Sequence, residues 1–473
     1  MLTLADVFEA LTNTRLEGAS LIISEASIDS RQVIPASMFV ALPDEHVDGQ
    51  DAVDQAFKRG AQLVLIQRDV SSDYPVVDIR SGRLPENFSL PQQPFCLRVE
   101  DTLIAFQQIA RYWRRRLDLR VIGITGSVGK STTKELVAEV LGQRYHTLKS
   151  PDNLNNEIGL PLSLLKLGKG HQRAVLEMGF YVPGEISFLC EMALPQVGVI
   201  TNVGTVHAER AGSQEEIAKG KAELIQALPP APEGTAILNY DDPWVRPMAS
   251  KTKASIFYYG LDPTADLWAD HIESQGLEGI FFRLHFHNEV LHLRVPLIGH
   301  HSVHTALRAA AIGLVEGLSW AEIVYGLQSS HAQLRMVAVH TLQGALILDD
   351  TYNASPESTL AALNLLSEME GRKVAVLGDM LELGQYEQIG HEMVGFRAAE
   401  VCDELVVVGE RGPMIAGAAQ QTGFPGASIQ TFQTVLGAIP YLQANLTEGD
   451  VVLIKGSLGL RMDRIVSALE VGE

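Results

Sequence analysis

Hydrophobic and polar residues follow two different periods along this chain, and the way these periods succeed one another marks three regions. Residues 1–97 mix short apolar runs of strand type with amphipathic helical segments, beginning with MLTLADVFEALTNT. They end in the proline-rich stretch LPENFSLPQQPF, which we interpret as a linker. The pattern therefore predicts a small α/β domain over residues 1–97.

From about residue 98, helical stretches separate strongly apolar strands such as RVIGITG, AVLEMG, VGVITNV and TAILNY. This alternation is typical of βαβ units and predicts a parallel sheet. The segment IFFRLHFHNEVLHLRV alternates on both sides of His287, Asn288 and Glu289, so we expect an antiparallel hairpin at the edge of that sheet. We assign residues 98–331 to a central domain.

A second series of apolar strands begins near residue 332 and consists of ALILDD, KVAVLGD, ELVVVG and DVVLIKG. Helical segments separate these strands as well, which predicts a doubly wound, Rossmann-like domain over residues 332–473. The expected fold class is therefore α/β, with three domains.

Composition and charge narrow the classes of function. The chain has 473 residues and a net charge of −20, which argues against nucleic acid or an anionic membrane as its main partner. Cys96, Cys190 and Cys402 are too few and too far apart for a disulfide framework or a zinc knuckle. No apolar run approaches the roughly 18 residues of a membrane span. We therefore expect a soluble, cytoplasmic protein.

The segment GITGSVGKST, residues 123–132, is a shortened relative of a phosphate-binding loop. The strict Walker A spacing would place a glycine at Ile124, whereas the nearby glycines are Gly123 and Gly126. An apolar strand precedes the segment and a helix follows it, so backbone N–H groups up to Ser131 and the helix dipole can face an anion. Lys130 would reach the terminal phosphates, and Ser131 would bind Mg²⁺. The alternative is a structural turn whose lysine points to solvent.

Two further residues lie where α/β sheets place their ligands. Glu177 ends the strand AVLEMG and His207 follows the strand VGVITNV, so both are at the carboxyl ends of strands. Mg²⁺ bound to a nucleotide prefers hard oxygen ligands and few protein groups. Alone, His207 would more often be an ordinary hydrogen-bonded histidine; beside a loop lysine and a strand-end glutamate, we interpret it as part of the site.

Lys221 occupies an unusual place on its helix, SQEEIAKGKAELIQAL. At 3.6 residues per turn, Ile217, Leu224 and Leu228 form the buried face, and Lys221 lies in the middle of that face. Lys219 lies on the opposite, charged face. A lysine in the position of Lys221 is either desolvated or snorkels, with its stem buried and its ammonium in water.

Several segments, in this order, resemble the Mur ligases along nearly the whole chain: DSRQVIPASMFVAL, TGSVGKSTTKE, NLNNEIGLP, LEMG, ITNVGTVHAE, KAELI, LDDTYNASPES, VLGDMLELG and KGSLGLRMD. DDTYNASPES and GDMLELG favour the members that add D-alanyl-D-alanine over other Mur ligases and over folylpolyglutamate synthase. The family uses a shortened loop, G-x-x-G-K-[ST], which residues 126–131 fit.

The resemblance implies a cytoplasmic, monomeric, ATP-dependent and Mg²⁺-dependent acid–D-amino-acid (peptide) ligase of peptidoglycan precursor synthesis. ATP would phosphorylate the terminal carboxylate of UDP-MurNAc-tripeptide, and the amine of D-alanyl-D-alanine would attack the acyl phosphate. Neither nucleic acid nor membrane insertion is expected. The other possibilities are another amide ligase of the superfamily, including folylpolyglutamate synthase, and a nucleotide-binding switch without ligase activity.

By position, the resemblance also implies roles for individual residues. Those expected at the nucleotide are Gly126, Ser127, Val128, Gly129, Lys130, Ser131 and Thr132 in the loop, with Arg335 and Asp350 from the carboxy-terminal domain. Those expected at Mg²⁺ are Ser131, Glu177, His207 and Lys221. Lys221 matches the family's carbamylated lysine. The residues expected to be catalytic are Lys130, Glu177, His207 and Lys221. Those expected at the UDP-linked substrate are Ser30, Arg31, Asn155, Asn156, Lys455 and Arg461. Ser302 and Thr305 depart from the family's adenine-side run, which usually has asparagines there.

Overall fold

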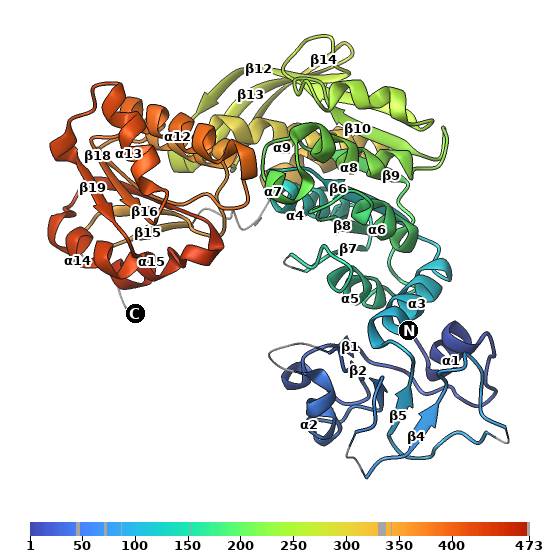
Figure 1. Cartoon of the computed structure of the whole chain (residues 1–473). Coiled ribbons are helices and arrows are strands. Elements are labelled where there is room, and N and C mark those ends of the chain that lie inside the picture. Colours follow the sequence, from blue (N-terminus) through green and yellow to red (C-terminus); the bar gives the residue numbers. More distant parts are fainter. Residues whose placement is uncertain are drawn as a thin grey trace. The chain divides into compact units, whose positions relative to one another are not determined.

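The computed structural model describes residues 1–470 except 44–47, 71–72, 87, 152, 330–336 and 342. Its strands form three sheets, visible in Figure 1. The α/β fold class predicted from the sequence is confirmed, while the limits of the three predicted domains stay a prediction. By its contacts the chain divides into two compact units: Met1–Gly123, Tyr145–Gly179 and Glu185–Val197 in the first, and Ile124–Arg144, Phe180–Gly184 and Gly198–Glu473 in the second.

The first sheet is small, and its strands pair in parallel in the order β1-β2-β3-β5-β4. The elements of this region are α1 (Leu4–Thr12), β1 (Ala26–Ser27), β2 (Met38–Val40), α2 (Val53–Lys58), β3 (Leu63–Ile66), β4 (Val76–Asp78) and β5 (Phe95–Arg98). A capping box between Thr3 and Asp6 begins α1 and satisfies N–H groups that the first turn leaves without helical partners. The proline-rich stretch lies between β4 and β5, so it connects two strands of one sheet; its interpretation as a linker between domains was wrong.

The second sheet has nine strands in the order β14-β13-β12-β11-β10-β9-β6-β8-β7. They are β6 (Arg120–Thr125), β7 (Thr147–Lys149), β8 (Arg173–Glu177), β9 (Val197–Ile200), β10 (Thr235–Asn239), β11 (Ser255–Gly260), β12 (Leu267–Ser274), β13 (Ile280–Phe286) and β14 (Glu289–Val295). The helices of this region are α3 (Thr102–Arg115), α4 (Lys130–Gly142), α5 (Gly159–Leu165), α6 (Glu185–Ala193), α7 (Ala208–Ala211), α8 (Gln214–Gln226), α9 (Val303–Val315) and α10 (Trp320–Gln328). The expected edge hairpin is confirmed, because β13 and β14 pair antiparallel and Phe286 faces Glu289 across the turn.

The third sheet has the order β15-β16-β20-β17-β18-β19, with only the β15–β16 pair antiparallel among the strands described. Its strands are β15 (Val337–His340), β16 (Leu346–Asp350), β17 (Arg372–Gly378), β18 (Glu404–Val408), β19 (Ile429–Phe432) and β20 (Asp450–Lys455). Its helices are α11 (Pro356–Glu368), α12 (Glu387–Val401), α13 (Gly412–Gln421), α14 (Val435–Asn445) and α15 (Asp463–Leu469). Four of these strands were predicted from the sequence, and β15 and β19 were missed.

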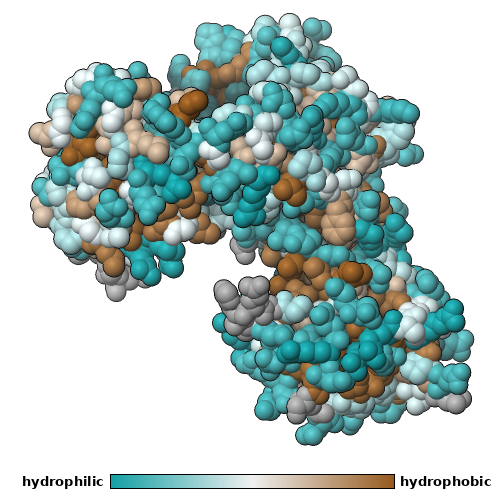
Figure 2. Space-filling model, in the orientation of Figure 1, coloured by the Kyte–Doolittle hydropathy of each residue, from teal (hydrophilic) through white to brown (hydrophobic). Residues whose placement is uncertain are grey.

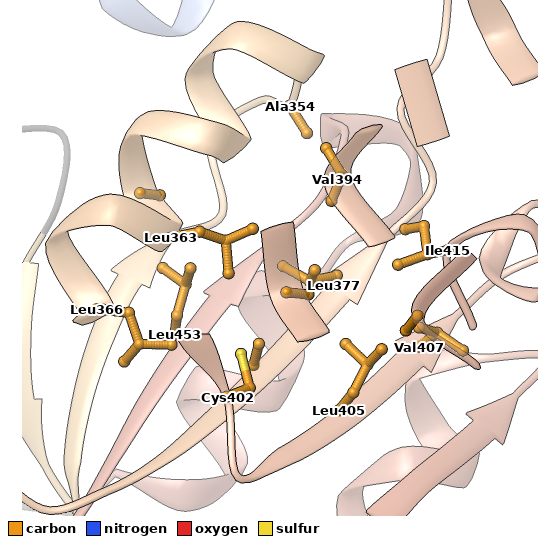
Figure 3. Packing of buried hydrophobic residues seen from close by; sticks show 14 of the residues in the cluster. Ala354, Leu363, Leu366, Leu377, Val394, Cys402, Leu405, Val407, Ile415 and Leu453 are labelled. Carbon is orange, nitrogen blue, oxygen red and sulfur yellow. The ribbon is translucent and has the colours of Figure 1, made fainter. Parts of the chain in front are cut away.

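Helices cover both faces of this sheet, with α12 and α13 on one side and α14 and α15 on the other (Figure 1). Successive side chains of a strand point to opposite faces, so β17 supplies both cores. Ala375 and Leu377 pack in one cluster, which Figure 3 shows with Leu363 of α11, while Val374 and Val376 pack in the other. The near-continuous apolar strands recognised in the sequence are thus explained by burial on two faces.

The surface drawn in Figure 2 is covered mainly by hydrophilic residues, and hydrophobic side chains interrupt it in small groups. Cys96, Cys190 and Cys402 are all buried, and none of these three thiols forms a disulfide. Within the described residues, none of the helices combines the length and the apolar composition that crossing a membrane requires.

Candidate functional site

The phosphate-loop segment joins β6 to α4, as the sequence predicted. Gly126 and Gly129 both have positive φ, 149° and 84°, a conformation that glycine adopts without strain. A Cβ on Gly126 would lie 1.8 Å from Oγ1 of Thr201. The close approach of the phosphate loop to the residues after β9 therefore also requires glycine at position 126. Gly129 immediately precedes Lys130, the first residue of α4, and Ser131 and Thr132 follow in the first turn. Backbone N–H groups at such a helix start can face an anion.

The residues that follow β9 hold this loop in place. The N–H of Val128 donates to Oδ1 of Asn202 at 2.9 Å, and Nδ2 of Asn202 donates back to the Val128 carbonyl at 3.1 Å. The Thr201 hydroxyl donates to the same carbonyl at 2.7 Å, and Ser127 Oγ accepts the N–H of Gly204 at 2.8 Å. Thr201 and Asn202 were not predicted from the sequence, although a signal was present, since they are two polar residues directly after an apolar strand.

The side chain of Lys130 turns back over the loop. Its Nζ donates to the carbonyl of Gly126 at 2.9 Å and to that of Ser127 at 3.3 Å. The ammonium group is therefore held at the loop itself, where it would meet an anion bound by the loop N–H groups. This geometry is inconsistent with the alternative of a lysine directed to solvent.

Lys221 is buried in the middle of α8. Only 1% of the residue is exposed, whereas the side chain of Lys219 is 62% exposed and forms an ion pair with Glu216. The exposed fraction of Lys221 is too small for snorkelling. Its Nζ lies 4.9 Å from the ring centroid of Phe180. Burial, and next the charge of Lys130, lower the pKa of Lys221 well below its ordinary value.

His207 directly precedes α7 and has a positive φ of 69°. Its Nδ1 lies 2.7 Å from Oε2 of Glu382, and its ring meets that of Tyr181 edge-on, with the centroids 4.8 Å apart. Burial lowers the pKa of His207 to about 4; the charges of Lys130 and Lys221 act in the same direction, and Glu382 opposes them. Lys130, Lys221 and His207 are thus close enough for their charges to interact.

Two carboxylates from the region of the third sheet contact the connection between β9 and α7. Glu382, within the GDMLELG segment, binds His207, and Glu357 in the first turn of α11 accepts hydrogen bonds from the N–H and hydroxyl of Thr205, at 2.9 and 3.2 Å. A Cβ on Gly204 would lie 2.7 Å from the Glu357 carboxyl group. Neither glutamate was predicted to have a role, because only the folded chain brings them beside His207 and Thr205.

Glu177 belongs to the other compact unit and is 1% exposed at the end of β8. Its Oε1 accepts a hydrogen bond from Nδ2 of Asn155 at 2.9 Å, and its N–H donates to Ser150 Oγ at 3.2 Å. Asn156, predicted beside Asn155 at the substrate, accepts hydrogen bonds through Oδ1 from the N–H of Ile158 and of the next residue. Asn155 therefore orients Glu177, and Asn156 holds the turn that precedes α5; their contacts with substrate stay a prediction.

The predicted residues of the third sheet include one close pair. Asp350 and Lys455 are register partners at the ends of β16 and β20, and Nζ of Lys455 lies 2.6 Å from Oδ2 of Asp350. Lys455 also donates to the carbonyl of Asn353 at 2.8 Å. Arg461, by contrast, is paired with its neighbour Asp463 at 2.8 Å and is exposed. Arg335 lies outside the described residues.

The two predicted UDP-binding residues lie in the first sheet's region at a single turn, η1 (Ser30–Gln32). Ser30 is buried, and its hydroxyl donates to Oε1 of Gln55 at 2.8 Å. The side chain of Arg31 is 77% exposed and forms two parallel hydrogen bonds with Asp29, at 2.9 and 2.8 Å. Arg31 therefore presents a guanidinium to solvent from a turn that Asp29 fixes.

Three family models match this chain: the Mur ligase family catalytic domain over residues 22–87, the Mur ligase middle domain over 124–313, and the Mur ligase glutamate ligase domain over 334–458. The UDP-N-acetylmuramoyl-tripeptide–D-alanyl-D-alanine ligase of Bacillus subtilis strain 168 is 34% identical over 458 residues, covering 95% of this chain and 93% of that protein.

Solved structures agree with the sequence comparison. A crystal structure of MurF from Acinetobacter baumannii is 30% identical, with a TM-score of 0.83 and coverage of 98% of both chains. MurF ligase from Thermotoga maritima in complex with ADP is 27% identical, with a TM-score of 0.76 and coverage of 94% of this chain and 96% of that one. Since the likeness extends over the full length in both sequence and fold, this chain belongs to the Mur ligase family.

Proposed function

We propose that this chain is an ATP-dependent ligase that joins D-alanyl-D-alanine to UDP-MurNAc-tripeptide in peptidoglycan precursor synthesis. The observation that carries the proposal is the full-length likeness to a D-alanyl-D-alanine ligase, 34% identical over 95% of this chain. The built phosphate loop with Lys130 folded over it supports the nucleotide half of the reaction. Action as a cytoplasmic monomer is part of the same proposal.

The loop residues 126–132 would hold the phosphates of ATP. Their N–H groups and the start of α4 provide positive partial charge, and Lys130 adds a full charge at the same place. A transferring γ-phosphoryl group carries its charge on peripheral oxygens, so catalysis depends mainly on positioning and neutralisation. Asp350 and Arg335 are the proposed nucleotide contacts from the carboxy-terminal region.

In the second unit, His207 and Ser131 are the proposed Mg²⁺ donors. Because Glu382 occupies Nδ1, the other ring nitrogen, Nε2, is left for a ligand, and the lowered pKa keeps the ring neutral as a metal ligand requires. Ser131 would add a hydroxyl, and Lys221 an oxygen donor once carbamylated. The role of Glu177 as a magnesium ligand stays a prediction from the resemblance. Bound Mg²⁺ would neutralise phosphate charge.

In the proposed reaction, an oxygen of the tripeptide's terminal carboxylate forms a bond to the γ-phosphorus, and the bond from that phosphorus to the β-phosphate oxygen breaks to release ADP. The amine of D-alanyl-D-alanine then attacks the acyl carbon, phosphate leaves, and the amine loses a proton. Lys130 would stabilise the charge on the transferred group in the first step. Ser30, Arg31, Asn155, Asn156, Lys455 and Arg461 are proposed to bind the UDP-linked substrate and the peptide.

The proposal is tested by measuring ADP release with each substrate omitted in turn. We expect turnover only when ATP, Mg²⁺, UDP-MurNAc-tripeptide and D-alanyl-D-alanine are all present, with a product that contains both peptides. Running the assay with tripeptides ending in diaminopimelate and in lysine identifies the natural third residue. ATP hydrolysis that ignores both acceptors would favour a nucleotide switch, and turnover with a folate or a single amino acid would favour another ligase of the superfamily.

A further inference from the structure

Arg308 is a buried arginine on α9 that faces the phosphate loop. The residue is only 4% exposed. A Cβ built on Gly129 would lie 3.1 Å from Nη2 of Arg308, and the helices α4 and α9 pack against each other. The guanidinium therefore lies against the residue at which the loop ends and α4 begins.

The partners of this guanidinium are all neutral. Nη1 donates to the hydroxyl of Tyr259 at 3.3 Å, and Nη2 donates to Oγ1 of Thr305 at 2.7 Å. Nε is buried and has no hydrogen-bond acceptor among the described residues. Within the same residues, no carboxylate forms an ion pair with Arg308. A buried cation without a counter-charge is costly, so it indicates that an anion belongs beside it.

A second buried arginine shows how this chain satisfies a guanidinium that has only a structural role. Arg114 is 3% exposed, and its three nitrogens donate to backbone carbonyls: Nε to Ala193 at 2.8 Å, Nη1 to Leu117 at 3.0 Å and Nη2 to Leu119 at 3.2 Å. Arg308 is as deeply buried but has an unfilled Nε and two hydroxyl acceptors. Arg308 therefore lacks a hydrogen-bond acceptor for one of its guanidinium nitrogens, whereas each nitrogen of Arg114 has one.

The two acidic residues whose charges act on Tyr259 have hydrogen-bond partners of their own. The charges of Asp242 and Asp241 act on the hydroxyl of Tyr259, which places both carboxylates in its neighbourhood. Asp241, however, lies 2.8 Å from Nε2 of His304, and Asp242 accepts hydrogen bonds from backbone N–H groups, including that of Val203 at 3.0 Å. Neither carboxylate forms an ion pair with Arg308, so a ligand is a suitable source of the compensating anion.

We propose that Arg308 is a further nucleotide-binding residue, whose guanidinium pairs with a phosphate of the nucleotide at the Gly129 end of the loop. The start of α4 and Arg308 meet there, so two sources of positive charge converge on the place where an anion is expected. Phosphate oxygens are the acceptors that match an arginine fork. This inference rests on the proposed function, because it assumes that the loop binds a nucleotide.

The test compares ADP binding by calorimetry in the wild type, Arg308→Met, Arg308→Lys and the matched control Arg114→Met. We expect Arg308→Met to bind ADP roughly 10- to 100-fold more weakly, the loss typical of one hydrogen-bonded charge pair. Its ADP affinity should also depend less on salt than that of the wild type, because one cation fewer faces the phosphates. The ADP affinity of Arg308→Lys should lie between those of the wild type and Arg308→Met. Arg114→Met should lower the melting temperature without changing ADP affinity.

A folded Arg308→Met protein that binds ADP with wild-type affinity and salt dependence would overturn the proposal, as would an equal loss of affinity in Arg114→Met. If Arg308→Met does not fold, the ADP affinity of Arg308→Lys is the test, because lysine keeps the charge and loses the arginine fork. Wild-type ADP affinity in Arg308→Lys would then overturn the proposal. Ligase turnover of the wild type is measured separately. ADP binding without turnover would refute the proposed function alone, and turnover with unaltered ADP binding in Arg308→Met would refute this inference alone.

Discussion

Replacing Lys221 with methionine should abolish activity and at the same time raise stability. Methionine keeps an unbranched, flexible side chain of similar length, with sulfur in place of one methylene and without the amine. The site is 1% exposed, so an apolar side chain fits its surroundings better than an amine does. Loss of function through unfolding would give the opposite change in stability, so the two measurements together identify the role of the amine.

The expected gain in stability follows from the protonation of the lysine. An amine with an ordinary pKa of 10.5 needs about 5 kcal/mol to lose its proton at pH 7. The Phe180 ring, 4.9 Å away, would favour the charged form by about 2 kcal/mol, which is less than burial costs. We therefore expect the free energy of unfolding to rise by about 1–4 kcal/mol, the range typical when buried charged groups are replaced by apolar ones.

The assay is thermal unfolding without Mg²⁺ or nucleotide, combined with the ligase assay. Lys221→Met should melt a few degrees higher than the wild type at pH 7, and the difference should shrink as the pH rises toward 10.5. In that pH range the unfolded lysine binds more protons than the folded one, so wild-type stability rises with pH. Turnover should fall below ~1%, as expected when a major electrostatic group is lost. Lys219→Ala, on the exposed face, should match the wild type in both measurements.

A methionine variant that is active, or that melts well below the wild type, would refute this reasoning. The carbamate itself needs a further experiment. A neutral lysine amine adds carbon dioxide and releases a proton, which leaves a carboxylate-like anion on Nζ. Lys221→Ala should therefore be nearly inactive and should regain some turnover with small added carboxylates that fill the vacated place; the absence of any rescue together with an unmodified Lys221 in a liganded crystal would exclude the carbamate.

Three other substitutions test the loop and its neighbours. Lys130→Ala should lose more than ~99% of turnover while staying folded, because the phosphates lose a full positive charge; near-normal kcat would exclude the nucleotide loop. Gly126→Ala should abolish measurable ADP binding in calorimetry, since its Cβ would lie 1.8 Å from Thr201 Oγ1, and wild-type affinity would contradict the geometry. Glu382→Ala should lower kcat roughly 10- to 100-fold by releasing Nδ1 of His207, and an unchanged kcat would show that this pair has no functional role.

Local sequence patterns were sufficient for much of the fold and for the residues that end strands. Four apolar strands of the second sheet (β6, β8, β9 and β10), four of the third (β16, β17, β18 and β20), the hairpin of β13 and β14, and the strand–loop–helix around Lys130 follow from periodicity and glycine placement, whereas β7, β11 and β12 were not predicted. The place of Lys221 on the buried face of α8 also followed from the helical period, because its neighbours on that face are apolar, but the structure was needed to show that the amine is buried as well. These features depend on residues close together in the chain.

The features that were missed depend on residues far apart. Nothing local in GDMLELG indicates that Glu382 lies beside His207, and nothing local in α9 indicates that Arg308 faces Gly129. The short edge strands β15 and β19 were missed because strands of four residues give little periodic signal. The proline-rich stretch was misread for the same reason: composition indicates a loop but does not say which elements the loop connects.

The net negative charge of the chain makes the positive groups at the phosphate loop decisive for binding anionic substrates. A protein of net charge −20 repels ATP and a UDP-linked substrate at long range, so electrostatic attraction over the whole surface cannot account for binding. Screening limits that repulsion to about 8 Å at physiological salt, and within this distance the arrangement of individual groups decides the potential. The second unit places Lys130, Arg308 and the start of α4 around one short loop. Selection for phosphate is therefore a property of this loop and its immediate neighbours, and removing one of those charges should cost affinity that the rest of the molecule cannot restore.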